Sequence, residues 1–94
     1  MVHERIVRVR IHGKVQGVWY RAWTNEEARE LGIDGWVRNR KDGTVEAVFA
    51  GTVADVDRML ELCRSGPPLA RVDTIDVESE GEAPPAGFEQ RHTV

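Results

Sequence analysis

The pair Asp42-Gly43, set between two segments of alternating apolar and polar residues, is the strongest local structural signal in this sequence. Aspartate followed by glycine readily supplies the positive backbone angles that a tight hairpin turn requires. The segments Gly35 to Arg40 and Thr44 to Ala50 are therefore predicted to be strands joined at Lys41-Asp42-Gly43. This hairpin makes a β-sheet part of the expected fold.

Three further segments have the two-residue period or the boundaries of strands. Val7, Val9 and Ile11 alternate with arginines, which predicts a strand from Arg5 to Ile11 that is buried on one face. The segment from Arg71 to Glu78 alternates in the same way and is predicted to be the fourth strand. A link rich in glycine and proline follows, and a short terminal strand is expected around residues 88–94.

A first helix is expected to end at Leu31, because Gly32 stands where the left-handed residue that closes a helix is needed. Its start is less well defined. Periodicity allows a start at Tyr20 or Arg21, whereas the local pattern at Thr24 resembles a capping box and favours a later one.

A second helix is predicted from the capping box Thr52-Val53-Ala54-Asp55. Ser65-Gly66-Pro67-Pro68 ends it. Its expected apolar stripe consists of Val53, Val56, Leu60 and Cys63.

The resulting order is strand, helix, strand, strand, helix, strand, with a short C-terminal strand added. Because both helices are amphipathic and every strand alternates, we expect a mostly antiparallel sheet with both helices on one face. That architecture is the α+β, ferredoxin-like α/β sandwich (βαββαβ). With 94 residues, of which 40% are hydrophobic and 31% charged, the chain is expected to form a single soluble domain over residues 1–94.

The charge and the cysteine content narrow the possible partners and compartments. A formal charge of -3 gives no global positive field, so no nucleic-acid partner is expected. The single cysteine, Cys63, cannot form an internal disulfide and fits a cytoplasmic, reducing compartment. The start MVHERIVRVR lacks the apolar core of a signal peptide, and no long apolar run occurs, so no membrane association is expected.

The segment HGKVQGVWYR, residues 12–21, leads from the first strand into the first helix. Such a loop directs unpaired backbone N–H groups at one point, and the helix dipole adds partial positive charge there. Gly13 and Gly17 permit the curled backbone, and Arg21 supplies a fork that matches phosphate or carboxylate. These features favour an anion site, although a plain turn followed by a solvated arginine is the alternative.

Asn39 lies on the same face of its predicted strand as Val37, where its carboxamide could position a water molecule. A structural asparagine that caps the hairpin is the alternative interpretation. Arg38 and Arg40 point the other way in ideal alternation and are expected to be solvated. The histidines lack the spacing of metal ligands, so no metal is expected.

Two segments resemble the signatures of the acylphosphatases. Residues 13–21, GKVQGVWYR, closely resemble G-x-V-Q-G-V-x-[FY]-R. Gly35-Trp36-Val37-Arg38-Asn39 with Asp42-Gly43-Thr44-Val45-Glu46 resembles G-[WY]-V-x-N-x-x-[DG]-G-x-V-E. The similarity runs from about Arg5 to the C-terminus and agrees with the ferredoxin-like order.

The resemblance implies a metal-free hydrolase that splits small-molecule acyl phosphates into a carboxylate and inorganic phosphate. We also expect a monomer that needs no cofactor. It implies that the helix begins directly after the loop, that Arg21 holds the phosphoryl group, and that Asn39 orients the attacking water. The phosphate-binding residues, where a phosphate or sulfate ion is also expected to bind, are then Val15, Gln16, Gly17, Val18, Trp19, Tyr20 and Arg21. We further expect the hydroxyl of Thr44 to support the Asn39 side chain by a hydrogen bond.

Two other classes of function share this architecture. A binding module for small ligands or RNA is possible because fold does not determine function, but RNA binders expose aromatic residues on a basic sheet. An acylphosphatase-like unit of a larger maturation enzyme is the second. Metal-independent release of phosphate from an acyl phosphate distinguishes the hydrolase.

Overall fold

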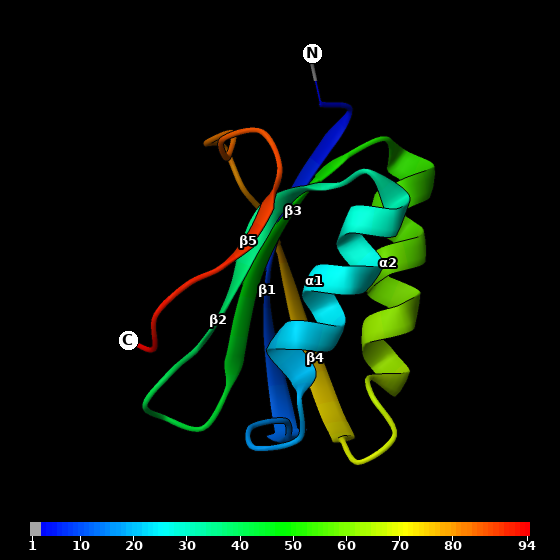
Figure 1. The fold of residues 1–94 in the computed structure, drawn as a ribbon. Coiled ribbons are helices and arrows are strands. Elements are labelled where there is room, and N and C mark those ends of the chain that lie inside the picture. Colours follow the sequence, from blue (N-terminus) through cyan, green and yellow to red (C-terminus); the bar gives the residue numbers. More distant parts are fainter. Residues whose placement is uncertain (1–2) are drawn as a thin grey trace.

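The computed structural model describes residues 3–94 as a five-stranded sheet covered on one face by two helices (Figure 1). The sheet has the spatial order β4-β1-β3-β2-β5. Its elements are, in chain order, β1 (Arg5–Lys14), α1 (Tyr20–Leu31), β2 (Asp34–Asn39), β3 (Val45–Gly51), α2 (Val53–Ser65), β4 (Arg71–Ser79) and β5 (Phe88–Gln90). The expected ferredoxin-like sandwich is confirmed. Met1 and Val2, which the expected domain includes, lie outside the described residues.

Strand direction brings two chain segments to the same end of the sheet. Both β1 and β2 pair antiparallel with β3, so they run in the same direction and their C-terminal ends lie at the same end of the sheet. The loop after β1 and the β2–β3 turn therefore lie at one end of the molecule, at the bottom of Figure 1. β5 adds to β2 in parallel, with Val37 opposite Gln90.

The core lies between the sheet and the helices. β1 and β3 contribute alternating buried residues, and α2 contributes a stripe with spacings of three and four residues: Val7, Val9, Ile11, Val45, Ala47, Phe49, Val56, Met59, Leu60 and Cys63. The expectation that Val53 belongs to this stripe is wrong, because its side chain is exposed. Met59, which was not expected in the stripe, is buried. Val53 stands at the first position of α2, one turn before the helix packs against the sheet. No helix within residues 3–94 has the length and apolar character to cross a membrane.

The predicted hairpin and the predicted first helix both form, but each differs from the local prediction in one detail. In the turn, Gly43 has a φ of 93°, but Asp42 does not adopt a positive φ and instead uses its carboxylate to accept hydrogen bonds from Thr44. α1 begins at Tyr20 and not at the capping-box pattern of Thr24. Thr24 is buried one turn inside the helix, where its hydroxyl donates to Tyr20 O at 2.8 Å.

We expect Gly13→Ala to destabilise the fold by at least about 2 kcal/mol, because the strand pair has no room for a side chain there. Gly13 has a φ of 132° beside a shift of register in the β1–β4 pairing. A Cβ at this position would lie 2.1 Å from Arg71 O, so the two backbones would have to separate. Urea unfolding measures the loss. Gly81→Ala, which adds a Cβ in open space, is the control, and an equal effect of both variants would contradict the steric explanation.

Candidate active site

The loop between β1 and α1 is curled by two residues in the left-handed region. Gly17 has a φ of 74°, and Trp19 has a φ of 67° and a ψ of 21°. Within residues 3–94, Trp19 is the only residue other than glycine with a positive φ. This conformation costs an L-residue about 1–2 kcal/mol, so the rest of the fold must hold the loop in place.

The N-terminus of α1 lacks the cap that protects α2. At α2, the Thr52 hydroxyl accepts a hydrogen bond from the Asp55 amide at 3.1 Å, whereas Trp19 gives α1 no side-chain cap. The first bond of α1 runs from Trp23 N to Trp19 O, and among residues 3–94 the amides of residues 16–22 donate to no protein acceptor. Free amides at the positive end of a helix dipole form a site that attracts an anion.

A cavity of about 450 Å³ opens at this helix end and joins the two predicted halves of the site. Arg21 lines it from the first turn of α1, and Asn39 lines it from the end of β2. The other residues that line it are Val15, Gly17, Trp19, Tyr20, Ala22 and Gln90. A guanidinium and a carboxamide thus share one cavity with unpaired backbone amides.

Three side chains of the predicted phosphate loop are buried in the core and fix the loop. Two of them are Val15 and Val18. The ring of Tyr20 is buried as well, and its hydroxyl donates to Cys63 O at 2.6 Å. Burial raises the pKa of Tyr20 and raises the pKa of the Cys63 thiol to about 12, so neither group is ionised near neutral pH. The loop is therefore anchored to α2.

The structure contradicts the expected hydrogen bond from Thr44 to Asn39. The Thr44 hydroxyl instead donates to Asp42 Oδ1 at 2.6 Å, on the residue two positions earlier in the turn. Hydrogen bonds from the Thr44 hydroxyl and then from its amide lower the pKa of Asp42. Within residues 3–94, the Asn39 side chain forms no hydrogen bond, which leaves its donor and its acceptor available to a bound molecule.

Arg38 and Arg40 are not the solvated charges that alternation predicts. On the uncovered face of the sheet, both donate to Glu46 Oε1, at 2.7 and 3.0 Å, and Arg8 donates to Glu46 Oε2 at 2.7 Å. The Glu46 side chain is only 3% exposed. Burial raises the pKa of Glu46, but the hydrogen bonds from Arg38, Arg8 and Arg40 outweigh it, so the net pKa is lowered. The two arginines on either side of Asn39 are thus fixed by one carboxylate.

We expect Glu46→Gln to destabilise the fold by about 2 kcal/mol at pH 7, the size of a lost charge-assisted hydrogen-bond set. Since folding lowers the pKa of Glu46, its contribution is present above its unfolded pKa of about 4.3 and is lost as pH falls through the lower folded value. Urea unfolding at pH 7 and pH 3 should therefore show a smaller loss of stability on acidification for Glu46→Gln than for the wild type. Glu61→Gln, in an exposed pair with Arg58, is the control. Parallel pH dependence of Glu46→Gln and the wild type would contradict the assignment.

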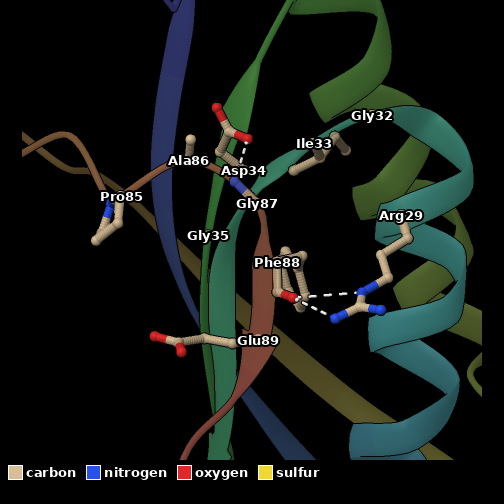
Figure 2. Close-up of a pocket in the computed structure, with 10 residues that line it drawn as sticks. All are labelled: Arg29, Gly32, Ile33, Asp34, Gly35, Pro85, Ala86, Gly87, Phe88 and Glu89. Atoms are coloured by element: carbon tan, nitrogen blue, oxygen red, sulfur yellow. Dashed lines mark hydrogen bonds between the residues drawn. The ribbon is translucent and has the colours of Figure 1, made fainter.

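A second cavity, of about 570 Å³, lies at the other end of α1 (Figure 2). Its polar groups are engaged in holding β5 to the sheet edge: the Arg29 guanidinium donates to Phe88 O at 3.1 Å, and Asp34 accepts the Gly87 amide at 2.8 Å. Hydrogen bonds from His3 and then from Gly87 lower the pKa of Asp34. This cavity contains none of the predicted site residues and is larger than the one beside Arg21.

Sequence reasoning missed Ala22 and Gln90 as lining residues of the Arg21 cavity. The sequence indicates which way the Gln90 side chain faces, because Gln90 follows the apolar Phe88 by two residues and therefore shares a strand face with it. No sequence pattern indicates the parallel pairing of β5 with β2, which brings Gln90 to the cavity.

Comparison with known proteins gives a consistent result. A sequence model of the Acylphosphatase family matches residues 7–90, which include the loop, Arg21 and Asn39. An acylphosphatase of Rhizorhabdus wittichii is 58% identical over 87 residues, 93% of this chain and 88% of that protein. One of Rhodospirillum rubrum is 59% identical over 83 residues, 88% of this chain and 91% of that protein. The solved structure of an acylphosphatase from Coxiella burnetii has a TM-score of 0.90 at 34% identity, over 95% of this chain and 94% of that chain.

Proposed function

The chain belongs to the acylphosphatase family, and we propose that it hydrolyses acyl phosphates at the cavity that Arg21 and Asn39 share. The products are a carboxylate and inorganic phosphate. The observation that carries the proposal is that Arg21, Asn39 and loop residues whose amides have no acceptor within residues 3–94 line the same cavity.

In the proposed mechanism, the loop amides of residues 15–21 and the Arg21 guanidinium hold the phosphoryl oxygens. A water oxygen attacks phosphorus, the bond from phosphorus to the carboxylate oxygen breaks, and the acyl group leaves as a carboxylate. Because a carboxylate is a good leaving group, the main requirement is to stabilise charge on the equatorial oxygens. Donors that are fixed before the substrate arrives meet this requirement.

Asn39 is proposed to orient the attacking water from the other side of the cavity. Its carboxamide has no protein partner within residues 3–94, so one oxygen and one NH₂ group remain to hold a water molecule in line. The proton of the water passes to the phosphate product or to solvent, and no side chain of the cavity needs to act as a base.

The remaining properties of the enzyme are proposals of the same kind. The substrate is a small, diffusible acyl phosphate, and phosphate or sulfate binds as a product-like ion to the same amides. We place the enzyme in the cytoplasm as a monomer of one domain. The buried, unpaired thiol of Cys63 fits a reducing compartment.

The test is to incubate the purified chain with benzoyl phosphate and, separately, with acetyl phosphate, in the presence of a metal chelator. We expect inorganic phosphate and carboxylate to appear in equal amounts, at a rate proportional to the enzyme concentration. Absence of phosphate release with both substrates would contradict the proposal.

A further inference from the structure

The two halves of the proposed site come from separate segments that share no strand pairing. The phosphate-binding half is the loop between β1 and α1, and the water-orienting half is the end of β2 with its turn. Loops without regular structure drift relative to their neighbours unless side chains tie them. Val18 and Tyr20 anchor the loop to the core and to α2, so the distance between phosphorus and water depends in addition on the contacts that join the loop directly to the hairpin.

Gln16 makes that connection. Its Nε2 atom donates to Arg40 O at 2.7 Å and to Thr44 O at 2.8 Å, so both hydrogens of the amide group are used. Because both partners are carbonyl oxygens, the NH₂ end must face them, and this fixes the orientation of the carboxamide. Arg40 directly follows Asn39, so the tie lies one residue from the proposed water-orienting side chain.

The two hydrogen bonds of Gln16 attach the loop to a turn that is held by hydrogen bonds of its own. The Arg40 amide donates to Thr44 O at 2.9 Å, and the Arg40 guanidinium is fixed on Glu46. Two bonds from one side chain onto two carbonyls restrict both the separation and the rotation of the loop relative to the turn. On the loop side, Gln16 lies three residues before Trp19, whose left-handed backbone is unfavourable for an L-residue and must be held by the surrounding contacts.

We propose that the Gln16 side chain is a positioning residue that sets the placement of Asn39 relative to the phosphate loop. The proposal rests on the proposed function. Its distinctive feature is that Gln16 acts through its carboxamide on the hairpin, in addition to any contact of its backbone amide with phosphate. A misplacement of about 1 Å between reacting groups lowers a rate by about 10²-fold, so the tie is expected to affect kcat strongly.

The test uses Gln16→Met, which keeps the length of the side chain and removes its donors. We expect kcat for benzoyl phosphate to fall by about 10-fold to 10²-fold. Competitive inhibition by inorganic phosphate should stay within about 2-fold of the wild type, since the loop amides and Arg21 are untouched. Equal losses of kcat and of phosphate affinity would overturn the proposal, because they would indicate a collapsed loop.

A double-mutant cycle with Asn39→Ala separates the positioning role from a general one. If Gln16 acts through Asn39, adding Gln16→Met to Asn39→Ala lowers kcat by less than about 2-fold further, whereas additive losses overturn the proposal. Wild-type activity in Asn39→Ala would also overturn the proposal, because Gln16 would then have no water-orienting residue to place. The proposed function fails only if the wild-type chain releases no phosphate, so the two failures are distinguished.

Arg29→Met is the control for a structural effect, since it also removes a side-chain bond to a backbone carbonyl, at the other end of α1. It should lower the free energy of unfolding without changing kcat in the folded protein. A kcat loss in Arg29→Met as large as that in Gln16→Met would contradict a specific role for Gln16.

Discussion

Replacing Arg21 with alanine should lower kcat/KM for an acyl phosphate by at least about 10²-fold and leave the fold intact. Arg21 lines the cavity from the first turn of α1, where the amides of residues 16–22 donate to no acceptor within residues 3–94. The guanidinium is the only cationic side chain among the residues that line this cavity. Its removal leaves charge on the transferred phosphoryl group uncompensated in the transition state.

The measurement is steady-state hydrolysis of benzoyl phosphate together with inhibition by inorganic phosphate. Both should weaken in Arg21→Ala, since the guanidinium contacts phosphate in the substrate and in the product. Arg64→Ala, an exposed arginine in the last turn of α2, is the control and should retain full activity. Wild-type hydrolysis by Arg21→Ala would refute the assignment of the site.

Asn39→Ala should lower kcat by about 10²-fold with little change in phosphate inhibition, because the proposed contact is with water and not with the phosphoryl group. The free energy of unfolding should change by less than about 0.5 kcal/mol, since the side chain forms no hydrogen bond within residues 3–94. Steady-state kinetics and urea unfolding measure the two quantities.

Asn25→Ala is the control for this prediction, as it changes the same residue type on α1, outside the cavity. The Asn25 Oδ1 atom is buried without a hydrogen-bond partner among residues 3–94, so its removal should not reduce stability or activity. A loss of phosphate affinity in Asn39→Ala as large as the loss in kcat would assign Asn39 to phosphate binding instead of water orientation.

Local chemistry was sufficient to predict the elements, whereas most of the positions that line the cavity were predicted from the resemblance of two segments to the acylphosphatase signatures. Neighbouring residues determine three of these features, so the sequence predicts them: the Asp42-Gly43 turn, the end of α1 at Gly32 and the cap of α2 at Thr52. The placement of Arg21 and Asn39 on one cavity follows from strand direction, since β1 and β2 both pair with β3.

The contacts that sequence reasoning could not predict join residues far apart in the chain. Glu46 is surrounded by arginines from β1, β2 and the turn, and alternation shows only that these residues share a face. The start of α1 at Tyr20 has no local cap, so the local rules pointed to Thr24. The bond from Thr44 to Asp42 depends on the exact path of the turn, which no residue pattern specifies.

The exposed indole of Trp19 has an experimental consequence. The chain has three tryptophans, of which Trp36 is enclosed by guanidinium groups, including Arg38 at 4.6 Å from the ring centroid. Only Trp19 lines the cavity beside Arg21, with 78% of its surface exposed. Its emission therefore offers an intrinsic optical reporter of occupancy, with which ligand affinities can be titrated in variants that no longer turn over substrate.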